Sequence, residues 1–364
     1  MQRLGAVLLA MLILAAGCER SPEAAAPPPA EQRQPPPQLA ASRIPMTHGL
    51  SMIGVDAGGG PVQADESTAM GQPASWSRNL VVTASPSYRH ALARKSGKAV
   101  VVGLDSEVST LGEDIAPTAA NTNLAFSPDE RWLAWPGRDG VEVAELVAGQ
   151  ARGHDAPFPA AAGRAAKFAG WTVDNRLIVA GDKALYTMTV DGKDTKQVAD
   201  AVLTGGDTGG GLQSIAHSYV QVNPVTGELA YTDKDPATRQ PRLVITDASF
   251  QPKRTVPRRS LSNFTADGKF YAGQGLGTAD DVRLVCAWES GECRELPQYT
   301  LLSPWPNGLL PMQPASGTQR ITALFDPATG RQQPPPAAFK VVDTPREVLP
   351  TGLVQLLSKV APTG

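Results

Sequence analysis

A short unit of strand, tight turn and strand recurs along this chain at nearly constant spacing, and this recurrence constrains the fold more than any other feature. The clearest copies lie at residues 124–134, 171–178, 222–230 and 263–271, and weaker copies surround Ser87 and Asn307. Successive turn positions are separated by 42, 45, 52, 41 and 40 residues, with a mean of 44. These positions are Ser87, Asp129, Asp174, Thr226, Asp267 and Asn307.

A period of about 44 residues is typical of the four-stranded blades of a β-propeller, in which a turn joins the inner strands of each blade. Residues 44–364 hold about seven such periods, so the sequence predicts an all-β propeller of seven blades, with six or eight as alternatives. We expect the last blade to combine Val348 to Leu357 with a strand near Leu50 to Val55, which closes the ring and leaves no sheet edge exposed. An irregular β-sandwich with coincidental turn spacing is the competing fold.

The composition agrees with a loop-rich all-β protein. The 364 residues include 35 Gly and 33 Pro, which turns favour, and 41% of the residues are hydrophobic, enough for a sizeable core. Long amphipathic helical patterns are absent beyond residue 43. Because the net charge of −2 excludes an overall basic surface, we expect no nucleic-acid partner.

Two copies of the unit resemble the repeats of TolB-type, WD40-like propellers. They are Ser127-Pro-Asp-x-x-Trp-Leu-Ala134 and Ala266-Asp-Gly-Lys-Phe270, and the resemblance covers roughly residues 75–335. The chain departs from the pattern in two ways, because the first and sixth copies are degenerate and the Gly-His and Trp-Asp signatures of WD40 blades are missing. The resemblance therefore implies the fold and not a particular function.

The N-terminus carries a separate signal. Arg3 precedes an apolar run over residues 4–16, which is too short to span a bilayer and has the proportions of a signal peptide. The run ends in Leu14-Ala-Ala-Gly-Cys18, which resembles the lipobox of bacterial lipoproteins. That resemblance implies removal of residues 1–17 and acylation of Cys18, with diacylglycerol and a further acyl chain such as palmitate, so that this end binds the lipid bilayer. An ordinary secretory signal with a chance cysteine is the alternative.

The residues after Cys18 predict where the protein is held and how it is tethered. Glu19 stands where inner-membrane lipoproteins tend to have Asp, so the resemblance implies the periplasmic face of the outer membrane, with the inner membrane as the alternative. Residues 18–43 are rich in Pro, Ala, Gln and Glu and predict a disordered tether that can reach up to roughly 75 Å. A proline-recognition motif is the other interpretation. The predicted parts are a signal peptide at 1–17, the tether at 18–43 and the propeller at 44–364.

Once Cys18 is lipidated, Cys286 and Cys293 form an even pair in an oxidising compartment and predict a disulfide. A four-residue loop over residues 288–291 would place the two cysteines opposite each other across an antiparallel hairpin. A redox pair would favour a closer Cys-x-x-Cys at a helix start, which is absent. We therefore expect a structural bridge.

Two segments are candidate partner-binding loops. The 52-residue spacing places an insertion at the glycine-rich residues 203–213, which lack the Lys-Ser/Thr of a phosphate-binding loop. A basic stretch surrounds Pro257. For both segments, a solvated connector between blades is the competing interpretation. The candidate contact residues are Gly205, Gly206, Asp207, Gly209, Gly210, Gly211, Lys253, Arg254, Arg258 and Arg259.

The sequence shows no linear catalytic or metal motif, so we predict no catalytic residue, metal or cofactor. The histidines are far apart and none has the spacing of a His-Glu-x-x-His site, and no nucleophile elbow or calcium loop is present. A propeller enzyme can nevertheless assemble its site from separate blades. His217 near Asp207 is the best remaining candidate for such a site.

These observations favour an outer-membrane lipoprotein whose periplasmic propeller is a non-enzymatic scaffold that binds another envelope protein through its loops. Two alternatives come from other classes. One is an immunity or inhibitor lipoprotein that blocks a toxic hydrolase. The other is a propeller hydrolase, such as a lactonase, with its site at the mouth of the central channel.

Overall fold

The computed structural model describes residues 49–65, 72–73, 81–95, 98–112, 124–164, 166–203, 219–276, 282–301, 303–316 and 320–360. The predicted signal peptide, Cys18 and the tether fall outside the described residues, so the domain boundary at residue 43 stays a prediction. Within the described ranges, no helix is long and apolar enough to cross a membrane.

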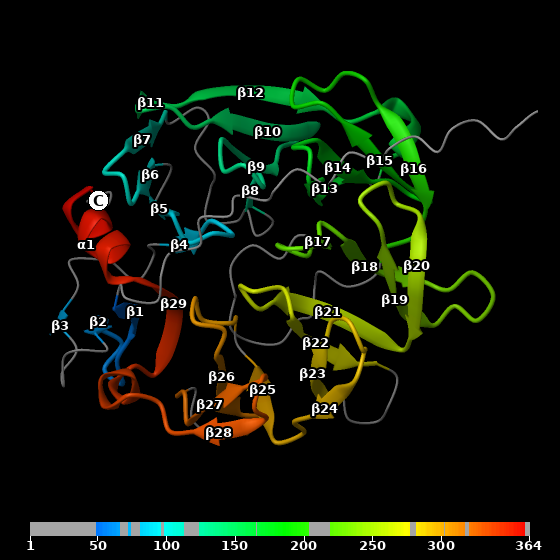
Figure 1. Ribbon diagram of the computed structural model, residues 1–364. Coiled ribbons are helices and arrows are strands. Elements are labelled where there is room, and N and C mark those ends of the chain that lie inside the picture. The colour runs from blue at the N-terminus through cyan, green and yellow to red at the C-terminus, as the bar shows by residue number, and fades with distance from the viewer. Residues whose placement is uncertain are drawn as a thin grey trace, which may run out of the picture. The chain divides into compact units, whose positions relative to one another are not determined.

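Seven sheets form a ring around a central axis, as the repeat predicts (Figure 1). Six of them are formed from strands that follow one another in the chain from the centre of the ring outward. The first three blades contain β4 (Val81–Ala84), β5 (His90–Lys95), β6 (Lys98–Gly103) and β7 (Val108–Leu111); β8 (Ala125–Phe126), β9 (Trp132–Pro136), β10 (Gly140–Glu145) and β12 (Arg152–Pro157); and β13 (Lys167–Trp171), β14 (Leu177–Ala180), β15 (Ala184–Met188) and β16 (Lys196–Asp200).

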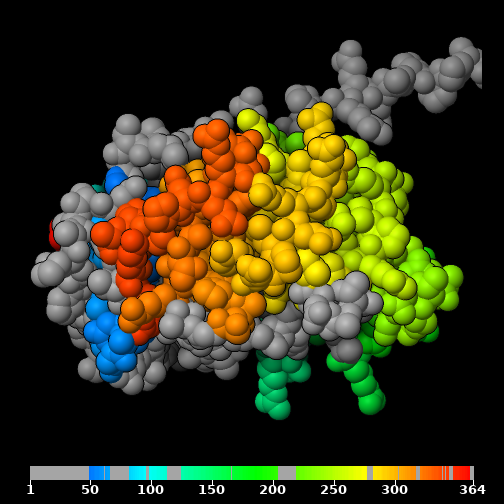
Figure 2. All heavy atoms as spheres, turned by 90° about the horizontal axis from the view of Figure 1, so that it is seen from below, coloured from blue at the N-terminus to red at the C-terminus, as the bar shows by residue number. Residues whose placement is uncertain are grey.

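The next three blades follow the same order, and blades 5 and 6 lie next to each other in the edge-on view of Figure 2. They contain β17 (Val220–Val222), β18 (Leu229–Lys234), β19 (Pro241–Thr246) and β20 (Pro252–Pro257); β21 (Arg259–Phe264), β22 (Phe270–Gly275), β23 (Arg283–Ala287) and β24 (Cys293–Glu295); and β25 (Tyr299–Leu301), β26 (Leu310–Pro314), β27 (Ala323–Asp326) and β28 (Arg331–Gln333). The remaining short elements are β11 (Gly149–Gln150), which pairs in parallel with β7, and the 3-10 helices η1 (Ala160–Ala162) and η2 (Ala337–Val341).

The seventh blade joins the two ends of the folded chain. Its innermost strand is β29 (Thr344–Pro350), followed outward by β1 (Leu50–Val55), β2 (Pro61–Asp65) and β3 (Gln72–Pro73). The register pairs Leu50 with Pro350 and Val55 with Thr344. The predicted closure of the ring by an N-terminal and a C-terminal strand is therefore confirmed, and the fold is a seven-bladed propeller and not a sandwich.

The prediction of a strand that continues to Leu357 is wrong, because the strand ends at Pro350 and helix α1 (Thr351–Val360) follows. The buried residues of this segment are Leu353, Val354 and Leu357, a helical spacing and not the alternation of a half-buried strand. The helix packs against β1, β29, β5 and β6, where it extends the core between the last blade and the first.

All six predicted turn positions lie between the first and second strands of blades 1 to 6. In blades 2, 3 and 5 a hydroxyl two residues earlier donates to the turn aspartate, as Ser127 does to Asp129 Oδ1 at 2.6 Å. The same hydroxyl accepts a backbone N–H at the start of the second strand or one residue before it, as Ser127 Oγ does from Trp132 at 3.0 Å. These local bonds explain why the Ser/Thr-x-Asp pattern recurs with the blades.

Seven clusters of buried apolar side chains fill the seven interfaces between neighbouring blades. Successive residues of a strand point to opposite faces, so each inner strand serves two interfaces. On β5, Leu92 packs against Leu133 and other residues of blade 2, whereas Ala91 and Ala93 face the closing blade. The core is therefore a ring of interfaces and has no single centre.

Candidate functional site

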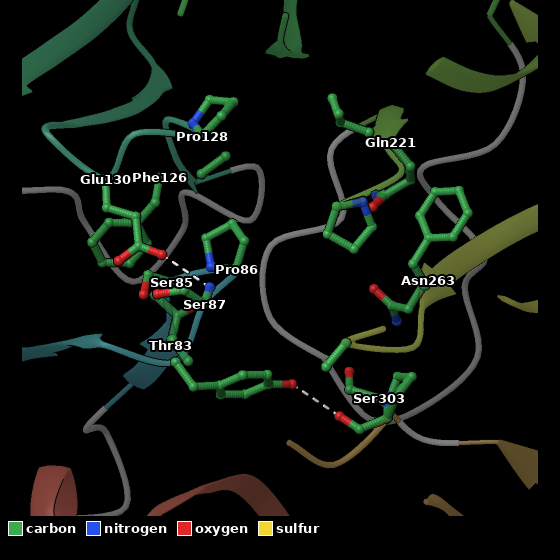
Figure 3. A pocket seen from close by; sticks show the side chains of 18 of the residues that line it. Thr83, Ser85, Pro86, Ser87, Phe126, Pro128, Glu130, Gln221, Asn263 and Ser303 are labelled. Carbon is green, nitrogen blue, oxygen red and sulfur yellow. Dashed lines mark hydrogen bonds between the residues drawn. The ribbon is translucent and has the colours of Figure 1, made fainter. Parts of the chain in front are cut away.

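Residues of the innermost strands and of the turns that follow them in blades 1, 2, 4 and 5, together with Trp171, Ser303, Pro304 and Glu347, surround a hollow of about 250 Å³ at one mouth of the central channel. Every blade contributes a lining residue. Figure 3 shows Glu130 and Ser87 on one side of the hollow, with Gln221 and Asn263 opposite. The described lining includes Thr83, Ser85, Pro86, Ser87, Tyr88, Phe126, Pro128, Glu130, Trp171, Gln221, Pro224, Asn263, Phe264, Ser303, Pro304 and Glu347.

Glu130 ties blade 2 to blade 1 at the edge of this hollow. It lies in the β8–β9 turn with a φ of 59°, and its carboxylate accepts the Ser87 backbone N–H at 2.9 Å and lies 2.6 Å from His90 Nδ1. Burial alone would raise the pKa of Glu130, but the hydrogen bonds from His90 and Ser87 and the charge of His90 outweigh it and hold this pKa below its usual value. Glu130 is therefore a charged structural contact.

Tyr88 crosses from blade 1 toward blade 6. Its hydroxyl donates to the backbone carbonyl of Pro304 at 3.0 Å, which Figure 3 draws as a dashed line. Burial, and secondly the charge of Glu347, raise the pKa of Tyr88, so this hydroxyl stays protonated. The bond fixes the position of the ring beside the hollow.

Glu347 lies on β29, the innermost strand of the closing blade, and is one of the residues that line the hollow. Burial raises the pKa of Glu347 to about 8, although the Val348 backbone N–H, 3.3 Å from Oε1, acts in the opposite direction. Near neutral pH the folded protein therefore holds this carboxyl close to its point of titration, which is a common property of functional residues.

The predicted basic residues do not gather at this hollow. Lys253 pairs with Glu228, and the Arg254 guanidinium donates to the Trp288 carbonyl at 2.7 Å, both from the outer strand β20. Arg259 begins β21, where its Nη1 lies 2.6 Å from Cys293 Sγ. Arg258 sits between the two strands with a φ of 52°. Three of these four side chains therefore make contacts within the protein, and a role for them in partner binding stays a prediction.

The predicted disulfide joins Cys286 and Cys293, with their Cα atoms 4.0 Å apart. The two residues pair directly between β23 and β24, and the Ala287 N–H donates to the Glu292 carbonyl at 2.9 Å, as the four-residue loop requires. The bridge belongs to the core between blades 4 and 5, and it lies away from the residues that line the hollow.

Several predicted residues fall outside the described part of the chain. They are Cys18, the segment Gly205, Gly206, Asp207, Gly209, Gly210 and Gly211, and His217. His48, for which no role was predicted, also lies outside the described residues. The connection between β16 and β17 contains the glycine segment, which agrees with the placement of the long spacing there. Of the two described histidines, His90 contacts Glu130, whereas Nε2 of the exposed His154 lies 2.8 Å from the Val190 carbonyl. No group of three metal-ligating side chains occurs among the described residues.

Sequence reasoning missed the three ionisable residues of the described lining, Tyr88, Glu130 and Glu347. Tyr88 and Glu130 follow the turn positions Ser87 and Asp129, where three other copies have glycine. A non-glycine residue at a left-handed turn position is the signal that could have identified them. Glu347 has no comparable signal, because it reaches the hollow only through closure of the ring.

Comparisons with known proteins found similar solved structures at low sequence identity. No protein-family model and no curated protein matches the chain. Among solved structures it is similar to TolB from Acinetobacter baumannii, with 12% identity over 69% of this chain and a TM-score of 0.41, and it spans 63% of that protein's length. It is also similar to a protein described as TolB from Agrobacterium tumefaciens (12% identity, 73% of this chain, 98% of the other, TM-score 0.39). A third is an oligogalacturonate lyase from Vibrio parahaemolyticus (11% identity, covering 78% of this chain and 84% of the other, TM-score 0.45).

Two of these structures have the name TolB, which is also the type of propeller that the repeats resemble. Because the three TM-scores lie below 0.5, these neighbours carry no argument about fold or function, and the assignment of seven blades rests on the chain's own sheet topology.

Proposed function

We propose that this protein is a lipoprotein of the periplasmic face of the outer membrane, anchored by acylated Cys18, whose propeller is a non-enzymatic scaffold that binds another envelope protein. The anchor and the location are supported by the apolar run that ends at Cys18 and by Glu19. The binding role is supported by the hollow at the channel mouth.

The observation that carries the binding role is a rigid, mixed lining contributed by all seven blades. Four prolines, Pro86, Pro128, Pro224 and Pro304, restrict the backbone around the hollow, and the lining also includes aromatic rings, amides, hydroxyls and carboxyls. A preformed concave surface with a few polar groups loses little conformational entropy on binding. Such a surface suits an inserted segment of a partner protein.

The direct test is a crosslinking pull-down of the lipidated protein from its native envelope. The proposal expects one specific protein to be recovered, and its recovery to fall when Asn263, which lines the hollow, is changed to Arg. The matched control is Ala237→Arg in the exposed turn between β18 and β19, at the other end of the sheet of blade 4. Recovery of no specific partner would contradict the scaffold, and recovery of a secreted hydrolase would favour the immunity function.

The lipid anchor has its own test. Cys18→Ser removes the thiol that would carry diacylglycerol, so the variant is expected in the soluble periplasmic fraction, whereas the unchanged chain sediments with outer-membrane vesicles. Immunoblots of the separated fractions measure this distribution. Continued membrane retention of the Cys18→Ser variant would refute anchorage through Cys18.

A further inference from the structure

The hollow contains one carboxyl with most of its hydrogen-bonding capacity unused. Glu347 borders the hollow from β29, and among the described residues its carboxylate has one hydrogen bond, from the backbone N–H of its own neighbour Val348 at 3.3 Å. By contrast, Glu130 accepts from Ser87 and contacts His90. Among the described residues, Glu347 is therefore the lining carboxyl with fewer hydrogen-bond partners, which makes it the candidate for binding a ligand.

The elements packed around the hollow provide no described cation for Glu347. The β4–β5 turn contributes Tyr88, whose hydroxyl is directed to Pro304, and the β8–β9 turn contributes Glu130, which is already paired with His90. The other described lining residues, from blades 3 to 6, carry no ionisable side chain. The described lining therefore contains two carboxyls, Glu130 and Glu347, and no lysine or arginine.

The ionised form of a buried carboxyl such as Glu347 opposes folding. Because burial raises the pKa of Glu347 to about 8, the ionised carboxylate destabilises the folded state relative to an exposed carboxylate. A cation that enters the hollow would remove this penalty and lower the pKa again. The fold therefore holds a carboxyl that is largely protonated near neutral pH, at a position where a positively charged ligand would favour its ionised form.

We propose that the hollow receives a basic side chain, lysine or arginine, from a segment of the partner protein, with its cationic group paired to Glu347. This inference rests on the proposed binding function and specifies its chemistry. A volume of about 250 Å³ fits one long side chain with part of its backbone, and not a folded domain. The aromatic and proline rings of the lining suit the apolar stem of such a side chain, while Glu347 binds its head.

The first experiment measures binding of a short probe to the full chain by ligand-observed NMR. The probe is the capped tripeptide Ac-Ala-Lys-Ala-NH2, and its matched control contains norleucine, which has a similar stem and no charge. We expect the lysine peptide to bind at least about tenfold more tightly at pH 9. Equal binding of the two peptides would overturn the inference. Equally tight binding of free putrescine would show that a peptide is not required and would overturn the assignment to a partner protein.

The second experiment identifies the carboxyl. Glu347→Gln keeps the shape of the side chain and removes its charge. It should therefore lower the affinity for the lysine peptide at least about tenfold at pH 9 and leave the affinity for the norleucine peptide unchanged. Glu289→Gln, at an exposed carboxyl, serves as the control and should change neither affinity. Unchanged affinity of the lysine peptide for a folded Glu347→Gln variant would overturn the role of Glu347.

The pH profile provides a readout that does not depend on the variant. Only the ionised carboxylate attracts the cation, so the affinity of the lysine peptide for the unchanged chain should fall by about tenfold for each pH unit below about 8. In carbon-13 NMR of labelled glutamate, the peptide should lower the pKa of the Glu347 carboxyl. An affinity that does not change between pH 6 and pH 9, or a carboxyl pKa that the peptide leaves unchanged, would contradict the proposal.

Failure of this inference can be told apart from failure of the proposed function. If the Glu347→Gln chain recovers the envelope partner as efficiently as the unchanged chain does, the scaffold function is supported and the cation site is refuted. If the unchanged chain recovers no partner, the scaffold function itself is refuted, regardless of the affinity for the lysine peptide.

Discussion

One residue position, the left-handed one in the turn after the innermost strand, contacts the preceding blade in blades 2, 3 and 5. Glu130 of blade 2 accepts the Ser87 N–H of blade 1, and Asn175 Oδ1 of blade 3 accepts the Asp129 N–H of blade 2 at 3.2 Å. Between blades 4 and 5 it is the carbonyl of Gly268 that accepts from the Asn223 side chain at 2.8 Å. The turn thus serves as a contact between blades as well as a reversal of the chain.

The pair formed by Glu130 and His90 allows a test of this contact. Glu130→Gln is expected to lower the free energy of unfolding by about 1–3 kcal/mol at pH 7, because a charged acceptor of two hydrogen bonds becomes a neutral one at a buried site. The pKa of Glu130 is held below its usual 4.5 in the folded state, so its contribution is present above that value and is lost as the pH falls through the folded pKa. Urea unfolding of both chains at pH 7 and pH 3 measures the difference.

The control for this variant is Glu289→Gln, which changes an exposed carboxyl and should shift stability by less than about 0.5 kcal/mol. A stability difference between Glu130→Gln and the unchanged chain that stays constant from pH 7 to pH 3 would show that the charge of Glu130 is not what holds the blades.

At the scale of elements, two equivalent turns differ in what surrounds them. Gly268 in the β21–β22 turn and Gly308 in the β25–β26 turn have φ angles of 65° and 81°. A Cβ on Gly268 would come within 2.5 Å of Asn223 Oδ1, whereas a Cβ on Gly308 would meet nothing within 4 Å. Asn223 is buried and accepts the N–H groups of Val225 and Thr226, so it has little freedom to move away.

We therefore predict that Gly308→Ala costs about 1 kcal/mol, the strain of a left-handed alanine, and that Gly268→Ala costs at least about 2 kcal/mol more. The additional loss reflects both the clash and the broken contact between blades 4 and 5. Thermal and urea unfolding of the two variants side by side measures the difference. Equal destabilisation by the two substitutions would mean that the turn does not couple these blades.

The success and failure of sequence reasoning at this scale have physical causes. The turns could be located because their side chains form local bonds, such as Thr265 to Asp267, which demand fixed residue types at fixed spacing. The disulfide hairpin followed from the same local geometry. Helix α1 was mistaken for a strand because a short apolar segment next to a real strand fits both the helical and the strand period. Its burial against β5 and β6 is a tertiary contact, which the local sequence pattern does not show.

At the scale of the whole molecule, closure of the ring creates the candidate site. The number of blades could be predicted because the spacing between successive turn positions gives the length of one blade. The hollow could not, because its lining comes from residues as far apart as Thr83 and Glu347, and no linear motif links them. Glu347 reaches the channel mouth only because β29 pairs with β1.

The central claim is that a protein partner binds at the hollow, and site-specific photocrosslinking in the native envelope tests it most directly. A diazirine amino acid placed at Ser303, which borders the hollow, should yield one specific protein adduct. The same amino acid at exposed Ala237, in the β18–β19 turn at the other end of the sheet, should not yield it. An adduct formed equally from both positions, or from Ala237 alone, would contradict binding at the hollow.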